Sequence, residues 1–243
     1  MDKLYIVIPA YNEEENIEEV INDWYPIIDK MSDDSRLVII DDGSKDNTYK
    51  IMQKLKEKYP KFEPITKSNE GHGATVLYGY NYAINNNADY IFQTDSDGQT
   101  LPSEFWPFWD ERKNYAMVIG HRKGRQDGIS RIFVTKTLKL SLFFMFHVWV
   151  KDANTPFRLM KADILKEKIK LIPEKYNLSN VILSVIYIKQ KLPVKYIEIT
   201  FRPRQGGVNS INMKKINKIG IKAIKDFRKI NKNLKKESDK NEK

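Results

Sequence analysis

Two aspartates one residue apart, Asp95 and Asp97, are the clearest candidates for chemistry in the sequence. They follow the run Tyr90-Ile91-Phe92, whose aromatic and β-branched side chains predict a short buried strand. Carboxylates do not stay unpaired in a protein core, so this strand must surface where they begin. Two carboxylates on a tight turn suit Mg²⁺ or Mn²⁺, and such ions usually bring phosphates with them. The pair therefore indicates a site for a divalent cation and a phosphorylated ligand.

Other expected strands also end in polar turns. The apolar run over residues 4–8 predicts a strand that Pro9 ends, and residues 37–40 predict one that ends at Asp41 and Asp42. Helical patterns follow both, and strands that alternate with helices imply a mostly parallel sheet with right-handed crossovers. Ligands of such sheets bind at the carboxyl ends of the strands. We therefore expect these turns to lie side by side at one edge.

The rest of the chain fits one α/β domain with a Rossmann-like, mostly parallel central sheet flanked by helices. Further strands are expected over residues 62–65, 115–119 and 194–201, and helices over residues 74–85, 132–150 and 181–191. Residues 151–158 read as a turn between the long aromatic helix and the later elements.

Composition limits the classes of function. The chain has 243 residues, 41% of them hydrophobic, which is enough for a substantial core. Cysteine is absent, so no thiol can act as a nucleophile or ligand. A net charge of +10 favours anionic partners such as nucleic acid, phosphorylated ligands or an anionic membrane face. No signal peptide is expected at the N-terminus, and no apolar run reaches the ~18 to 20 residues that span a bilayer.

The C-terminal region predicts a basic amphipathic helix over residues 213–237, followed by a disordered tail over residues 238–243. Its apolar residues share one face: Ile216, Ile219, Ala223, Phe227, Ile230 and Leu234. Lysines occupy the opposite face. This pattern suits a helix docked on the domain and equally a helix that lies on a membrane surface.

Four motifs in this order resemble family 2 glycosyltransferases of the GT-A fold: residues 8–13, 41–44, 69–73 and 95–99. Within that family the chain resembles the dolichol- or polyprenyl-phosphate sugar transferases, to which residues 152–158 and 204–210 are also similar. The resemblance implies a GT-A domain over residues 1–212, with a nucleotide-sugar half (1–122) and an acceptor half (123–212). The chain departs from the family pattern at His72, where many relatives have Lys, and at Pro156, where Gly is usual.

The resemblance also implies roles for individual residues. The nucleotide-sugar pocket would contain Pro9, Ala10, Tyr11, Glu13, Asp41, Asp42, Gly71, Gly73, Asp95, Ser96 and Asp97. The metal, Mg²⁺ or Mn²⁺, would be held by Asp95, Asp97 and Gln99. The catalytic residues would be Asp97, Arg122, Arg131 and Arg204, and the acceptor phosphate would meet Arg122, Arg131 and Ser210.

The implied reaction is an inverting transfer of a sugar from a UDP- or GDP-sugar to a polyprenyl phosphate. A phosphate acceptor is already an anion, whereas a sugar hydroxyl needs a base to take its proton. Glu174 is the nearest carboxylate for that role, and it leaves a saccharide or glycan acceptor as the alternative.

Two other classes of function fit the sequence less well. Nucleic-acid binding is disfavoured because the basic residues gather in the tail. A dehydrogenase is disfavoured because no Gly-x-Gly-x-x-Gly follows the first strand. The transmembrane helices that many relatives append are missing, so we expect any membrane contact to be peripheral or through a partner. The expected place is the cytoplasm, with peripheral association at the cytoplasmic face of a membrane. The protein would be held there by an anionic lipid surface or by a membrane-protein partner.

Overall fold

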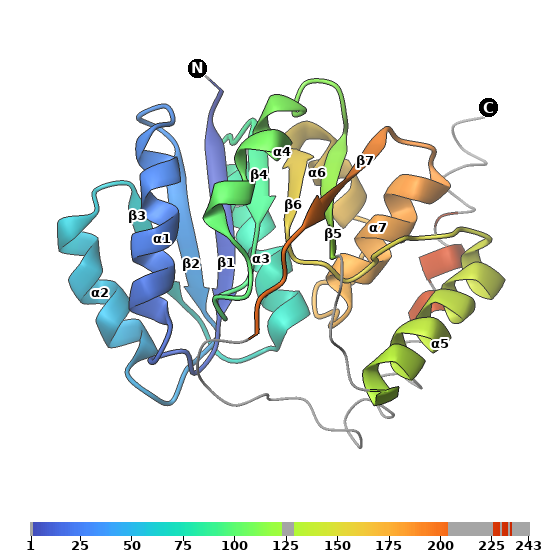
Figure 1. Cartoon of the computed structure of the whole chain (residues 1–243), viewed down its shortest axis with the longest axis horizontal. Helices are drawn as coiled ribbons and strands as arrows, with labels where there is room; N and C mark the ends of the chain where they lie inside the picture. The colour runs from blue at the N-terminus through green and yellow to red at the C-terminus, as the bar shows by residue number, and fades with distance from the viewer. Residues whose placement is uncertain (1, 123–128, 204–225, 229, 233, 235–243) are drawn as a thin grey trace.

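The computed structural model describes residues 2–122, 129–203, 226–228, 230–232 and 234, and over residues 129–136 it describes the backbone alone. The described residues form a seven-stranded sheet with the order β3-β2-β1-β4-β6-β5-β7 (Figure 1). The strands are β1 (Leu4–Ala10), β2 (Arg36–Asp41), β3 (Phe62–Thr66), β4 (Tyr90–Gln93), β5 (Met117–Arg122), β6 (Arg158–Lys161) and β7 (Val194–Ile199).

Most of the sheet is parallel, as the sequence predicts. Strand β1 pairs in parallel with β2 and β4, β2 pairs in parallel with β3, and β5 pairs in parallel with β7. Strand β6 is antiparallel to both of its neighbours, β4 and β5. Because β6 comes from the chain after residue 122 but lies between β4 and β5, the two halves of the chain share one sheet.

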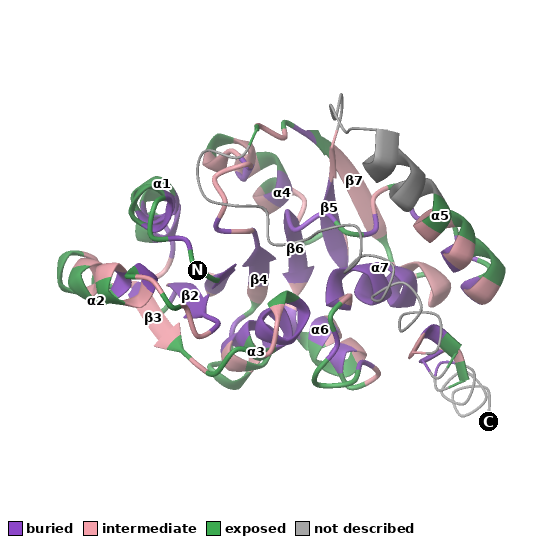
Figure 2. Ribbon diagram, turned by 90° about the horizontal axis from the view of Figure 1, so that it is seen from below, coloured by how far each residue is buried: buried purple, intermediate pink, exposed green. Residues whose placement is uncertain are grey.

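Helices cover both faces of the sheet (Figure 2). They are α1 (Ile17–Asp29), α2 (Thr48–Lys58), α3 (His72–Asn85), α4 (Trp106–Asp110), α5 (Ile129–Phe146), α6 (Ala162–Ile169) and α7 (Ser179–Lys189), with a short 3₁₀ turn at Pro102–Glu104. Side chains of β1 alternate between two cores: Ile6 packs with α1, α2 and α4, and Val7 packs with α3, α5, α6 and α7. Among the described residues, no helix is both long and apolar enough to cross a membrane.

The prediction that Pro9 ends the first strand is wrong, since β1 continues to Ala10 and Pro9 lies opposite Ile40 of β2. The main-chain groups of a strand point alternately to its two neighbours. The carbonyl of Val7 accepts a hydrogen bond from Thr94, so Val7, and Pro9 two residues later, face the β4 side. The ladder between β1 and β4 ends at Val7, so the missing N–H of Pro9 costs no ladder bond.

The sequence also missed β6 and α6, and it placed the end of β5 too early. Strand β5 extends through Arg122, which pairs with Ile199, instead of turning at residue 120. Strand β6 has only four residues and begins with a fully buried Arg158, so it lacks the apolar alternation that marks a strand. Its position depends on contacts with β4 and β5, which lie far away in the sequence.

The described part of the C-terminal segment docks on the domain. Phe227, Ile230 and Leu234 are each 1% exposed and belong to the core that contains α5 and α7. The rings of Phe146 and Phe227 are 5.5 Å apart, and Asn231 donates a hydrogen bond to the carbonyl of Met145. Of the two readings that the sequence leaves open, docking is therefore confirmed for these residues. The rest of the predicted helix and tail lies outside the described residues.

This docking predicts a large loss of stability for Phe227→Ala. A buried Phe→Ala change leaves a cavity and lowers the free energy of unfolding by about 3–5 kcal/mol. Lys232→Ala is the matched control, because Lys232 is exposed on the same segment and its loss should cost within ~0.5 kcal/mol. Urea denaturation measures both. If Phe227→Ala keeps wild-type stability and instead lowers binding to lipid vesicles, the segment belongs to the membrane surface.

Candidate functional site

The turns that follow β1 and β2 are joined to each other at the carboxyl edge of the sheet. The main-chain N–H of Asn12 donates to the hydroxyl of Ser44 (2.8 Å), and the N–H of Lys45 donates to the side-chain oxygen of Asn12 (2.8 Å). Asn12 adopts a left-handed conformation with φ 53°, which asparagine tolerates. The expectation that these turns meet at one edge is therefore confirmed.

Asp42 joins this edge to the glycine-containing loop before α3. Its carboxylate accepts hydrogen bonds from the N–H groups of Glu70 (3.0 Å) and Gly71 (2.8 Å) and forms an ion pair with Lys67 (2.7 Å). Gly71 has φ 90°, a conformation that favours glycine. A Cβ on Gly73 would lie 2.2 Å from the carbonyl oxygen of Tyr176, so a side chain there would displace the loop.

Asp41 and Glu13 also accept hydrogen bonds from other residues of the protein. Asp41 accepts hydrogen bonds from the N–H of Ser44 and the hydroxyl of Thr66, and Glu13 accepts one from the amide of Asn16. Pro9, Ala10 and Ser96 are buried at the same edge, and Tyr11 is exposed beside them. Nucleotide contacts of these residues stay predictions. What the structure adds is that Asp41, Asp42 and Glu13 hold the loops in place.

The Asp95–Gln99 turn follows β4 and is held from two sides. Asp95 Oδ1 lies 3.0 Å from Nε2 of His72, the first residue of α3. Asp97 accepts a hydrogen bond from the N–H of Gln99, and the side-chain amide of Gln99 donates to the carbonyl of Arg202 (2.9 Å). Arg202 in turn donates to the carbonyls of Gly98 and Gln99. Hydrogen bonds thus hold the chain after β7 against this turn.

Negative charge concentrates around His72. Desolvation opposes protonation of its ring, but attraction to Asp95, with further contributions from Asp97 and Asp42, outweighs it and raises the pKa of His72. These carboxylates therefore favour a positive charge at the ring of His72.

The donor set fits a divalent ion. Carboxylate and amide oxygens of Asp95, Asp97 and Gln99 are ligands that Mg²⁺ and Mn²⁺ accept, and the three residues belong to one turn. In the part of the chain that the structure describes, no group of three or more His, Asp or Glu side chains is already gathered around a common metal position. A bound diphosphate and water would complete the coordination, as is usual for Mg²⁺.

Comparison with known proteins identifies the family. Residues 5–168 match the model described as "Glycosyl transferase family 2". The chain belongs to this family. The UDP-N-acetylglucosamine–dolichyl-phosphate N-acetylglucosaminyltransferase of Methanococcus voltae is 29% identical over 188 residues, which cover 68% of this chain and 72% of that protein. The polyprenol monophosphomannose synthase of Mycolicibacterium smegmatis is 25% identical over 217 residues, which cover 85% of this chain and 80% of that protein.

Solved structures agree on the fold. Glucosyl-3-phosphoglycerate synthase from Mycobacterium tuberculosis, crystallised with Mn²⁺, UDP-glucose and phosphoglyceric acid, superposes with a TM-score of 0.71. The alignment covers 95% of this chain and 80% of that chain at 17% identity. The family 2 glycosyltransferase described here therefore has the GT-A fold that its sequence motifs predict.

The structure of this glycosyltransferase describes the arginines that the sequence predicts at the site to different extents. Arg122 forms a bidentate ion pair with Asp152, at 2.7 and 2.8 Å, and lies over the ring of Phe201. This pair uses only part of the donors of the guanidinium, so a phosphate contact of Arg122 stays a prediction. Arg131 lies in the first part of α5, residues 129–136, where the structure describes only the backbone, and Arg204 and Ser210 lie outside the described residues.

Sequence reasoning missed several residues that shape the site: His72 as a neighbour of Asp95, Asp152 as the partner of Arg122, Arg202 on the Asp95–Gln99 turn, and the buried Arg158. A signal existed for most of them. Asp152 and Arg158 lie in the segment that resembles the family, and Arg202 lies in the loop beside Arg204. Nothing in the local sequence shows which chain segment each side chain meets.

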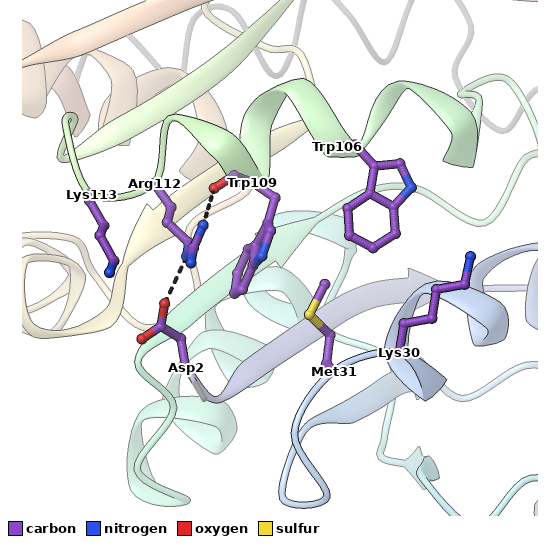
Figure 3. A pocket seen from close by; sticks show the side chains of 7 residues that line it. All are labelled: Asp2, Lys30, Met31, Trp106, Trp109, Arg112 and Lys113. Atoms are coloured by element: carbon purple, nitrogen blue, oxygen red, sulfur yellow. Dashed lines mark hydrogen bonds and ion pairs between the residues drawn. The ribbon is translucent and has the colours of Figure 1, made fainter.

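A hollow of about 310 Å³ lies near the start of β1, on the side of the sheet opposite the carboxyl ends of the parallel strands (Figure 3). Its lining combines two indole rings with basic side chains, one carboxylate and one thioether: Asp2, Lys30, Met31, Trp106, Trp109, Arg112 and Lys113. Arg112 pairs with Asp2 (2.8 Å) and stacks on Trp109. Since Asp2 precedes β1 and Lys30 follows α1, this hollow is separate from the turns at the carboxyl edge.

Proposed function

We propose that this family 2 glycosyltransferase transfers a sugar from a nucleoside-diphosphate sugar to a polyprenyl phosphate at a membrane surface. Two relatives that align over most of the chain are named for transfer to dolichyl phosphate and for the synthesis of a polyprenol monophosphate mannose. The donor would lie over the carboxyl edge, where Asp42 and Asp95 hold the loops together. The structural neighbour crystallised with Mn²⁺ and UDP-glucose supports a donor of this class.

A divalent ion held by Asp95, Asp97 and Gln99 would offset the negative charge that develops on the leaving diphosphate. The ion is Mg²⁺ or Mn²⁺ in this proposal. Arg202 is fixed on the same turn and adds a positive charge near it. Arg204, two residues further on, is the predicted second cation.

The proposed step is a single displacement. An oxygen of the acceptor phosphate forms a bond to the anomeric carbon, and the bond from that carbon to the diphosphate oxygen breaks, with its electron pair leaving on the diphosphate. Attack from the opposite face inverts the anomeric configuration. The acceptor is already an anion, so no proton has to be removed. Arg122 and Arg131 are proposed to hold that phosphate, because guanidinium binds phosphate in a bidentate manner.

The observation that best supports a lipid acceptor is the exposed aromatic surface on and beside α5. Phe144 and Trp149 are 68% and 63% exposed, and Leu140 and Phe143 are exposed beside them. The ring of Phe143 contacts those of both Phe144 and Trp149, so the side chains form one patch. Large exposed apolar patches mark interaction or membrane sites. We call these four residues the α5 patch.

The rival acceptor, a saccharide, finds less support. It would need a base such as Glu174, which is exposed on the loop before α7. A phosphate acceptor needs no such base. Transfer assays that offer polyprenyl phosphate and soluble glycans with UDP- and GDP-sugars decide between the acceptors. Transfer to glycans alone would overturn the proposal.

The α5 patch predicts a defect in membrane binding for the double variant Phe144→Ser, Trp149→Ser. Burial of each aromatic side chain contributes about 1.5–3 kcal/mol, so binding to vesicles that contain anionic lipid should fall at least ~10-fold. Tyr78→Ser is the matched control, since Tyr78 is an aromatic residue exposed on α3. Vesicle sedimentation measures the effect. Equal binding by the wild type and the double variant would remove α5 from the proposed membrane face.

The same proposal implies where in the cell the enzyme acts. A nucleotide sugar and a basic chain with an exposed aromatic patch suit the cytoplasmic face of an anionic membrane. A membrane-protein partner would serve as an alternative anchor. Arg228 and Lys232 are exposed on the docked C-terminal segment and would add attraction that high salt weakens.

A further inference from the structure

We propose that His72 is a nitrogen ligand of the divalent ion, in addition to the oxygen ligands on the Asp95–Gln99 turn. The inference rests on the proposed function, since it concerns the same metal site. It assigns a ligand from a different element, the start of α3. The motifs that point to the metal contain no histidine.

The first argument is the distance between His72 Nε2 and Asp95 Oδ1, which is 3.0 Å. Metal–ligand bonds of ~2.1 Å at a right angle place two donor atoms ~3.0 Å apart. An ion could therefore bind both atoms as adjacent ligands at their present separation. In the absence of an ion, the same separation suits a hydrogen bond.

The second argument is how firmly His72 is held. Gly71 donates to Asp42, and the backbone of α3 at Gly73 is pressed against Tyr176. An ion pair between Lys175 and Glu70 (2.6 Å) ties the loop before α7 to the residues just ahead of His72. The histidine is therefore presented to the metal turn by packed backbone on both sides. Its side chain is still 51% exposed and open to a ligand from solution.

The third argument is the charge around His72. Asp95 is in direct contact with the ring, and Asp97 lies two residues further along the same turn. A divalent cation between Asp95 and the imidazole would neutralise more of this charge than a proton does. Imidazole also suits transition ions, whereas Mg²⁺ prefers oxygen. The proposal therefore favours Mn²⁺ or Co²⁺ over Mg²⁺ at this site.

The test uses the full-length protein with Mn²⁺ and UDP, and with Mn²⁺ and GDP. Electron spin-echo modulation of bound Mn²⁺ detects a directly coordinated imidazole nitrogen. We expect this ¹⁴N signal in the wild type and its loss in His72→Ala. Calorimetry should show at least ~10-fold weaker Mn²⁺ binding by the variant, a loss no smaller than that seen for outer-shell partners of metal ligands. Mg²⁺ binding should fall less.

The chain has three histidines, which makes the controls simple. His147→Asn is the matched control: His147 is exposed at the end of α5 with φ 57°, a conformation that Asn tolerates, and the ¹⁴N signal should persist. Bound Mn²⁺ without imidazole coupling in the wild type would overturn the role of His72 and leave the proposed function intact. Failure of Mn²⁺ to bind with either nucleotide, together with no transfer, would overturn both.

Discussion

Asp97→Asn should abolish sugar transfer while the protein stays folded, and Asp95→Asn should do the same. Each change keeps the size of the side chain and removes one negative charge from the turn after β4. Loss of charge stabilisation at the leaving diphosphate should lower the rate by ~100-fold or more. Initial rates with a nucleotide sugar and Mn²⁺ measure the effect, and calorimetry measures the metal-dependent binding of the nucleotide.

The matched control is Asp110→Asn, because Asp110 is exposed on α4 and away from the carboxyl edge. It should keep wild-type turnover and metal binding. Thermal unfolding of all three variants checks that the fold is intact. Wild-type turnover of both Asp95→Asn and Asp97→Asn would show that the metal site has been assigned to the wrong turn.

The carboxyl edge could be predicted because its signals are local. An apolar run followed by Asp41-Asp42, or by Asp95 and Asp97, shows both the strand and the place where it must surface. The rule that parallel strands end at one edge then brings these turns together without any structure. The positions of β1, β2 and β4 are correct for this reason.

What the sequence could not show depends on contacts between distant segments. The nucleotide contact of Asp42 stays a prediction, and nothing local shows that its carboxylate also accepts a hydrogen bond from Gly71, 29 residues later in the chain. Strand β6 is recognisable only beside β4 and β5, since a buried Arg158 breaks its apolar pattern. The C-terminal helix allowed two readings, because one apolar face serves docking and membrane binding equally well. The packing of Phe227 against Phe146 distinguishes them.

Arg158→Met should be among the most destabilising substitutions in this protein. The guanidinium is fully buried and donates to the carbonyls of Ala153, Thr155 and Asn180. It joins the segment before β6 to α7. Burial lowers the pKa of Arg158, because desolvation disfavours the charged guanidinium.

That desolvation cost does not make the substitution favourable. Met fills a similar volume but removes the charged hydrogen bonds to all three carbonyls, each of which contributes about 1.5–3 kcal/mol. Ser184 still donates to Ala153 and Asn180, so the carbonyl of Thr155 is the one left without a donor among the described hydrogen bonds. We therefore expect the free energy of unfolding to fall by about 3–5 kcal/mol, measured by urea denaturation. Arg112→Met is the matched control, because the side chains of Arg112 and its partner Asp2 stay 21% and 31% exposed, and their ion pair should contribute about 1 kcal/mol. If Arg158→Met loses no more than Arg112→Met, water reaches these carbonyls, and the junction between β6 and α7 does not depend on the arginine.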